Sequence, residues 1–162
     1  MMDGKQHIQQ AYKSLLEHDF EQAINSFEQA VADEPGNASF HYSLSITYAR
    51  SNKLNKAIAH AEIAASLDSE AANYRLHLDT LYARQLLVDA ERLMLDDGGS
   101  SCEMPLLERA VSLDPLSVEA RVMLAISLNK QRRFADAEDA LREALKLDPE
   151  HVEANQLLRE YE

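Results

Sequence analysis

The chain has 162 residues, 46% of them hydrophobic, with only 4 Gly and 4 Pro, so it can bury a core and has few points at which a helix must stop. Its net charge of −12 disfavours nucleic acid as a partner, because an acidic surface repels phosphate backbones. No apolar run approaches the ~20 residues that span a bilayer, the N-terminus lacks a signal-peptide segment, and a single Cys is typical of a reducing compartment. We therefore expect a cytoplasmic protein without membrane insertion.

Residues that favour helices dominate the chain, and no run alternates as a strand would, so we expect an all-α fold. Taken in chain order, the amphipathic segments predict four helix–turn–helix units and one final helix. The units cover about 4–37, 38–71, 72–117 and 118–151, and the final helix covers 152–162.

Each unit closes at an anchor residue that stops its second helix, and the anchors set the spacing of the units. Pro35 and Ser69 are 34 residues apart, and so are Pro115 and Pro149. Pro cannot extend a helix, and it moves the preceding residue out of the helical region. An Ala precedes each anchor by five residues, where a small side chain lets two helices approach closely. These alanines are Ala30, Ala64, Ala110 and Ala144.

This pattern resembles the tetratricopeptide repeat (TPR) family, whose 34-residue unit is a helix–turn–helix with small, aromatic and Pro positions in this order. The resemblance covers nearly the whole chain. It implies a right-handed α-solenoid of about four units plus a C-terminal capping helix, which together form a single domain over 1–162.

The third unit contains a twelve-residue insertion, because 46 residues instead of 34 separate Ser69 from Pro115. The turn of this unit should fall at Leu86-Leu87, but nothing there would break a helix. We therefore expect one long first helix over about 72–96. The alternative is a short helix at 88–96 followed by an extra helix at 103–113.

The extended part of this helix carries an apolar stripe. Because repeats of normal length cannot fully cover such an extension, we expect the stripe to expose apolar surface. The stripe then forms a contact with a partner or a second copy, or it packs against an elongated loop. Its residues are Leu86, Leu87, Ala90, Leu93 and Met94, while Val88 and Leu95 lie on the opposite side of the helix. The candidates for the contact are Leu86, Leu87, Leu93 and Met94.

The sequence contains no clear set of catalytic or metal-binding residues. No two of its 6 His share the three- or four-residue spacing that places two ligands on one helical face. The acidic, Gly-containing run at 96–100 lacks the ligand spacing of a calcium loop and is interpreted as a turn. Cys102 has no His nearby in the sequence, which favours a structural thiol. We expect no enzyme activity, no cofactor and no metal.

The TPR resemblance implies that the first helix of each unit lines a concave, peptide-binding face. Two Tyr, several aliphatic side chains and three cations there could receive an apolar segment with acidic flanks, although the cations are equally well explained as solvated. The branch of the family that grips carboxylates is disfavoured, because neither register of its pattern places the required Lys and Arg here. The concave-face candidates are Tyr12, Tyr42, Ile46, Arg50, Leu76, His77, Arg84, Val122, Ile126 and Lys130, with Ser39, Ser43, Asn73, Thr80 and Met123 beside them.

The function that these features predict is a non-enzymatic scaffold or adaptor that captures a peptide or helix of another protein in the concave groove. One alternative is a secretion-type chaperone that holds a client protein in the same groove. A second alternative is a self-assembling structural TPR protein, with copies joined through the insertion or the repeat ends.

Overall fold

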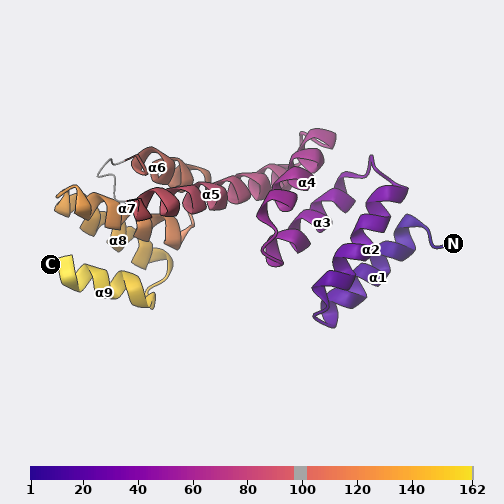
Figure 1. Cartoon of the computed structure of the whole chain (residues 1–162), viewed down its shortest axis with the longest axis horizontal. Helices are drawn as coiled ribbons and strands as arrows, with labels where there is room; N and C mark the ends of the chain where they lie inside the picture. The colour runs from indigo at the N-terminus through magenta and orange to yellow at the C-terminus, as the bar shows by residue number, and fades with distance from the viewer. Residues whose placement is uncertain (97–101, 162) are drawn as a thin grey trace. The chain divides into compact units, whose positions relative to one another are not determined.

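The computed structural model describes residues 1–96 and 102–161, and each regular element within these ranges is a helix (Figure 1). The predicted all-α class is therefore confirmed, while the turn predicted at 96–100 lies mostly outside the described residues. Within the described ranges, no helix is both long and apolar enough to cross a membrane. The helices are α1 (Gly4–Leu16), α2 (Phe20–Asp33), α3 (Ala38–Arg50), α4 (Leu54–Leu67), α5 (Ala72–Leu95), α6 (Met104–Leu113), α7 (Val118–Lys130), α8 (Phe134–Leu147) and α9 (Val152–Tyr161).

The second helix of each unit ends two residues before its anchor, as the sequence predicts. In α2, α4, α6 and α8 the residue after the last helical turn donates its backbone N–H to an alanine carbonyl, at N···O distances between 2.9 and 3.1 Å. This bond satisfies one of the carbonyls that a helix end leaves without an internal partner. The four accepting residues are Ala30, Ala64, Ala110 and Ala144.

Three units make their internal turn with a residue in the left-handed region. His18, Asn52 and Arg132 have φ of 60°, 57° and 60°. Leu86 occupies the equivalent position of the third unit and lies inside α5, which continues to Leu95. The structure thus has one 24-residue helix where the sequence predicted a single helix over about 72–96. The next helix, α6, carries a Pro in its first turn, where Pro is tolerated.

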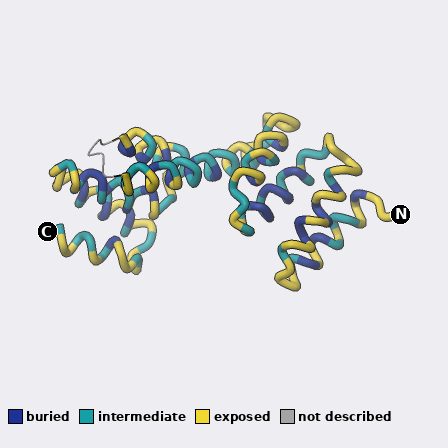
Figure 2. Tube along the Cα trace, viewed as in Figure 1, coloured by how far each residue is buried: buried dark blue, intermediate teal, exposed yellow. Residues whose placement is uncertain are grey.

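The chain divides into two compact units, Met1–Leu81 (unit 1) and Tyr82–Glu162 (unit 2), with the division inside α5. In both units the buried residues lie along one side of each helix and the exposed residues along the other (Figure 2). Amphipathic helices are expected to pack with their apolar, buried faces against one another. The organisation as a single repeat domain stays a prediction.

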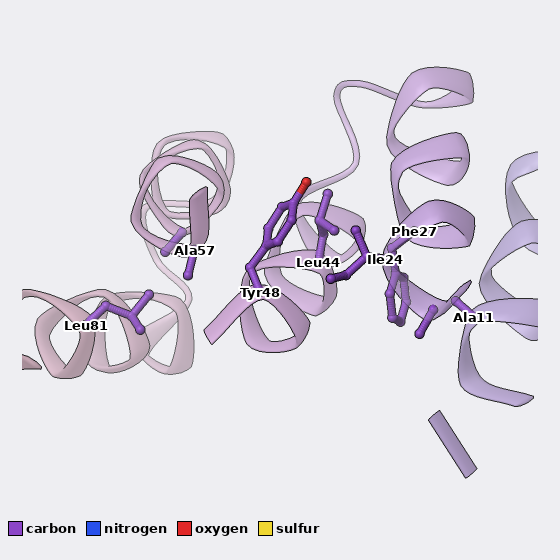
Figure 3. Close-up of a cluster of buried hydrophobic side chains, with 9 residues drawn as sticks. Ala11, Ile24, Phe27, Leu44, Tyr48, Ala57 and Leu81 are labelled. Carbon is purple, nitrogen blue, oxygen red and sulfur yellow. The ribbon is translucent and has the colours of Figure 1, made fainter. Parts of the chain in front are cut away.

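The core of unit 1 is built from α1 to α4 and the first part of α5. Figure 3 shows side chains of this core, which come from all five helices. The aromatic ring of Phe27 lies between Ala11 of α1 and Leu44 of α3. Phe27 and Leu44 are fully buried, and four alanines belong to the same buried cluster, where small side chains permit close packing of helices. These alanines are Ala11, Ala23, Ala57 and Ala61.

The core of unit 2 has two adjoining clusters. One joins the extended part of α5 to α6 through Leu87, Ala90, Leu107 and Ala110, each at most 5% exposed. The other joins α7, α8 and α9 around the fully buried Leu141. The insertion therefore adds to the core of unit 2.

The sequence predicted that the apolar stripe of α5 is only partly covered, and α6 covers more of it than a contact site on the stripe would require. Leu87 is buried, and Leu86 and Met94 pack partly buried against the same cluster, because α6 folds onto them. Leu93 is half-buried. The exposed apolar side chains of this part of α5 are instead Val88 and Leu95.

Candidate protein-binding groove

A groove of about 590 Å³ lies in unit 2 and is lined by side chains from α5, α7 and α9 and the turn before α9. It brings together three concave-face candidates from α7 and one candidate from the stripe of α5. The remaining lining residues were not predicted as binding residues, apart from Met123, which the TPR resemblance had also placed on the concave face. The full lining is Glu91, Met94, Leu95, Glu119, Val122, Met123, Ile126, Lys130, His151 and Glu153.

Helix α7 supplies one complete side of the groove. Its lining residues recur at three- and four-residue intervals from Glu119 to Lys130, so they share one face of the helix. Val122 is 2% exposed and anchors this face in the core, whereas Ile126 is half-buried and reaches the groove. The Ser117 hydroxyl accepts the N–H of Ala120 at 3.1 Å and caps the helix at its start.

The end of α5 supplies the most exposed apolar side chain of the groove. Leu95 is 79% exposed, while its neighbour Met94 packs against the α5–α6 cluster. A buried hydrogen bond ties the start of α6 to α7, since Ser127 Oγ donates to Glu103 Oε1 at 2.6 Å. The end of α5 is thus held beside α7 by packing on α6 and by this bond.

The third side of the groove comes from the start of α9. His151 Nδ1 accepts the N–H of Ala154 at 3.2 Å, so the neutral ring carries its proton on Nε2. Asn155 Nδ2 donates to the carbonyls of Pro149 and His151, both at 3.0 Å. These bonds fix the first turn of α9, which contains the groove residue Glu153.

The charges of the groove are mostly negative. Glu91, Glu119 and Glu153 are exposed carboxylates, and Lys130 is the one cation among the lining residues. Within residues 1–96 and 102–161, none of these three carboxylates forms an ion pair. The groove can therefore pair with cations of a bound molecule through charge-assisted hydrogen bonds.

Three concave-face candidates of unit 1, Tyr12, Tyr42 and His77, contact side chains of neighbouring helices, although Tyr12 is also 49% exposed. The ring of Tyr42 lies 4.8 Å from that of Tyr74 and 5.2 Å from that of His77, measured between centroids. Ser45 Oγ donates its only proton to the carbonyl of Ala57 at 2.7 Å, so its 2.9 Å contact with His77 Nε2 requires His77 to donate. These side chains join α3 to α5.

Tyr12 is likewise tied to its neighbours, because its ring meets Phe27 edge-on at 5.4 Å and its hydroxyl contacts Ser43 Oγ at 3.1 Å. The remaining candidates do not line the groove of unit 2. Ile46 is half-buried on α3, Arg50 is exposed at its last turn, Leu76 is 65% exposed on α5, and Arg84 is half-buried in unit 2. A continuous groove along the whole chain stays a prediction.

The repeat register could have predicted two of the groove's carboxylates, although they were not among the predicted binding residues. Glu119 and Glu153 are 34 residues apart and occupy the same repeat position as Ser39 and Asn73, which were placed on the concave face. Glu91 and Leu95 could not be predicted in this way, because they belong to the insertion and have no repeat equivalent. His151 belongs to the turn that precedes α9.

No group of three or more His, Cys, Asp or Glu in the described parts of the chain could hold a metal ion. Cys102, expected to be structural, is exposed.

Comparison with known proteins agrees with the repeat pattern. Two tetratricopeptide repeat family models match the sequence, one over residues 14–78 and the other over residues 105–155. Together these matches cover more than half of the chain. No curated protein matches the chain.

Solved structures share the fold at low sequence identity. MamA (41-end) from Desulfovibrio magneticus RS-1 is 17% identical with a TM-score of 0.60, and the alignment covers 98% of this chain and 82% of that solved chain. YrrB, described as a TPR protein with an unusual peptide-binding site, is 21% identical with a TM-score of 0.53, covering 98% of this chain and 80% of YrrB. The repeat matches, the 34-residue spacing and the helical pairs have one explanation: this chain is a member of the tetratricopeptide repeat family.

Proposed function

We propose that this chain is a protein-interaction scaffold and that it captures a segment of another protein in the groove of unit 2. The observation that supports this most directly is Leu95, a large apolar side chain that is 79% exposed beside a half-buried Met94 and Ile126. Apolar surface in a concave site is the usual feature of a binding groove.

The groove has the dimensions of a peptide site. The lining face of α7 runs from Glu119 to Lys130, about 16 Å at 1.5 Å per residue. A segment of two to three helical turns, or a shorter extended strand, fits along this face. The fold that this chain shares with YrrB, itself described as having a peptide-binding site, is consistent with such a role.

Leu95 also provides a clean test, because it lies outside the core and its replacement should leave the fold intact. Burying an exposed Leu contributes up to about 1.5–3 kcal/mol. We expect Leu95→Ser to weaken binding of a groove peptide by roughly tenfold, since part of this surface stays exposed in the complex. Leu116→Ser is the matched control, because Leu116 is 74% exposed in unit 2 and does not line the groove.

The experiment selects peptides from a displayed random library on the wild-type protein. The enriched peptides are labelled with fluorescein, and their affinities for the wild type and both variants are measured by fluorescence anisotropy. We expect loss of affinity for Leu95→Ser and none for Leu116→Ser. Equal affinity for all three proteins, or a selection that enriches no sequence family, would contradict the proposed function.

A further inference from the structure

We propose that the segment held in the groove of unit 2 is basic and amphipathic, with apolar residues flanked by Lys or Arg. This inference rests on the proposed function and deepens it, because it names the chemistry of the bound segment. It replaces the acidic flanks that the sequence had favoured.

The first argument is the origin of the carboxylates. Glu91 comes from α5, Glu119 from α7 and Glu153 from α9, so three helices direct acidic residues to one groove. Glu119 and Glu153 stand in the first turns of their helices, one repeat apart. Lys130 is the last residue of α7 and marks the other end of that face.

The second argument is that the groove carboxylates have no counter-charge within the described part of the protein. Some acidic side chains of unit 2 pair within their own helix or turn, as in Arg133–Asp136 at 2.8 Å and Arg142–Glu138 at 2.9 Å, whereas exposed carboxylates such as Glu108 do not pair within the described ranges. Among the described residues, the three groove carboxylates have no such ion pair. Their counter-charges must therefore come from solvent ions or from a bound segment.

The third argument is that charge and apolar surface occur together. An entirely basic segment would leave Leu95, Met94 and Ile126 in contact with water. An entirely apolar segment would cover carboxylates without pairing them, which is costly. A segment with apolar residues on one face and cations at its flank satisfies both requirements.

The test uses two synthetic peptides of about 13 residues, the length of α7. They share one apolar core of Leu and Ala, which is flanked by Lys in the first peptide and by Glu in the second. Fluorescence anisotropy at fixed salt gives both affinities. We expect the wild type to bind the Lys-flanked peptide about tenfold more tightly, because each exposed ion pair contributes only a small factor.

The decisive variant is Glu119→Lys with Glu153→Lys, which should cancel or reverse this preference. Glu70→Lys with Glu108→Lys is the matched control, since both residues are exposed, neither lines the groove, and the net charge changes equally. If the first pair lowers the melting temperature, Glu119→Gln with Glu153→Gln replaces it and should reduce the preference.

The outcomes separate the inference from the proposed function. The inference is overturned if the groove variant keeps the wild-type preference, or if the control variant loses it to the same extent, which would indicate bulk attraction to an acidic protein. The proposed function survives that result provided that Leu95→Ser weakens both peptides. If Leu95→Ser weakens neither peptide, both are wrong.

Discussion

At the scale of single residues, small side chains determine how closely the helices pack. Ala30, Ala64, Ala110 and Ala144 are all 0% exposed, and each also accepts a hydrogen bond that closes its helix. A methyl side chain lets a neighbouring helix come close, and the accepted bond satisfies a carbonyl at the helix end. One residue type at one position thus serves both packing and helix termination.

A hydrogen-bonded pair of a buried and a half-buried histidine in unit 1 was not predicted from the sequence. His41 is 4% exposed and donates from Nε2 to the Pro35 carbonyl at 2.9 Å, so its Nδ1 must accept from His60 Nδ1, also at 2.9 Å. Burial first, and then the electrostatic effect of the neighbouring His41, lowers the pKa of His60. The adjacent Tyr48 donates to Glu28, and burial followed by this hydrogen bond raises the pKa of Tyr48.

This geometry predicts that unit 1 loses stability in mild acid. Because the pKa of His60 is lower in the folded chain, the unfolded chain takes up its proton first as the pH falls below about 6.5. His60 is neutral in both states above that pH, and its contribution to stability is lost as the pH falls toward its folded pKa. Between pH 7 and pH 5, we expect the free energy of unfolding to fall less in His60→Gln than in the wild type. The Gln amide can still donate to His41.

Urea unfolding at several pH values measures this difference. His18→Asn is the control, because His18 is exposed and Asn tolerates its φ of 60°. An acid dependence that is unchanged in His60→Gln would show that the imidazole pair does not control it.

At the scale of elements, α5 distinguishes the third unit from the others. The other units turn at residues with φ near 60°, a conformation that is costly for Leu, and Leu86 instead continues the helix. Its extended part is then covered by α6, which begins at Met104. The insertion therefore lengthens one helix and enlarges the core of unit 2.

Two adjacent residues of α5 test this account of the insertion. Leu87 is 5% exposed and Val88 is 53% exposed. We expect Leu87→Ala to lower the free energy of unfolding by about 2–5 kcal/mol through a cavity, and Val88→Ala to change it by less than about 0.5 kcal/mol. Urea unfolding followed by circular dichroism compares the two variants, and equal small effects would mean that α6 does not cover α5.

The sequence predicted the helices well because their signals are local. Pro115 and Pro149 interrupt a helix whatever its tertiary surroundings, and Leu86 lacks the features of a turn residue. The burial of Leu87 by α6 could not be predicted, because it depends on the position that α6 takes after the insertion. The helical pattern places Leu95 on a face of α5 but does not predict which other helices line the space beside that face.

At the scale of the whole molecule, the chain is acidic, with a net charge of −12, and the groove of unit 2 is acidic as well. The repeat register predicted Val122, Ile126 and Lys130 there, because these residues follow the family's concave positions. It did not predict the acidic character, since Glu91 belongs to the insertion and Glu153 to a helix interpreted only as a cap. Part of the lining of the proposed groove thus comes from the insertion and the final helix, which depart from the regular repeat.

The most direct test of the proposed groove is methyl NMR of protein labelled at Met and Ile, titrated with a selected peptide. Met94, Met123 and Ile126 all line the groove, whereas Ile46 and Ile63 belong to unit 1. We predict that the largest shift changes occur at the three groove methyl groups and that they saturate together, with Ile46 and Ile63 unaffected. Changes confined to Ile46 or Ile63, with the groove methyl groups unmoved, would contradict the assignment of the binding site to unit 2.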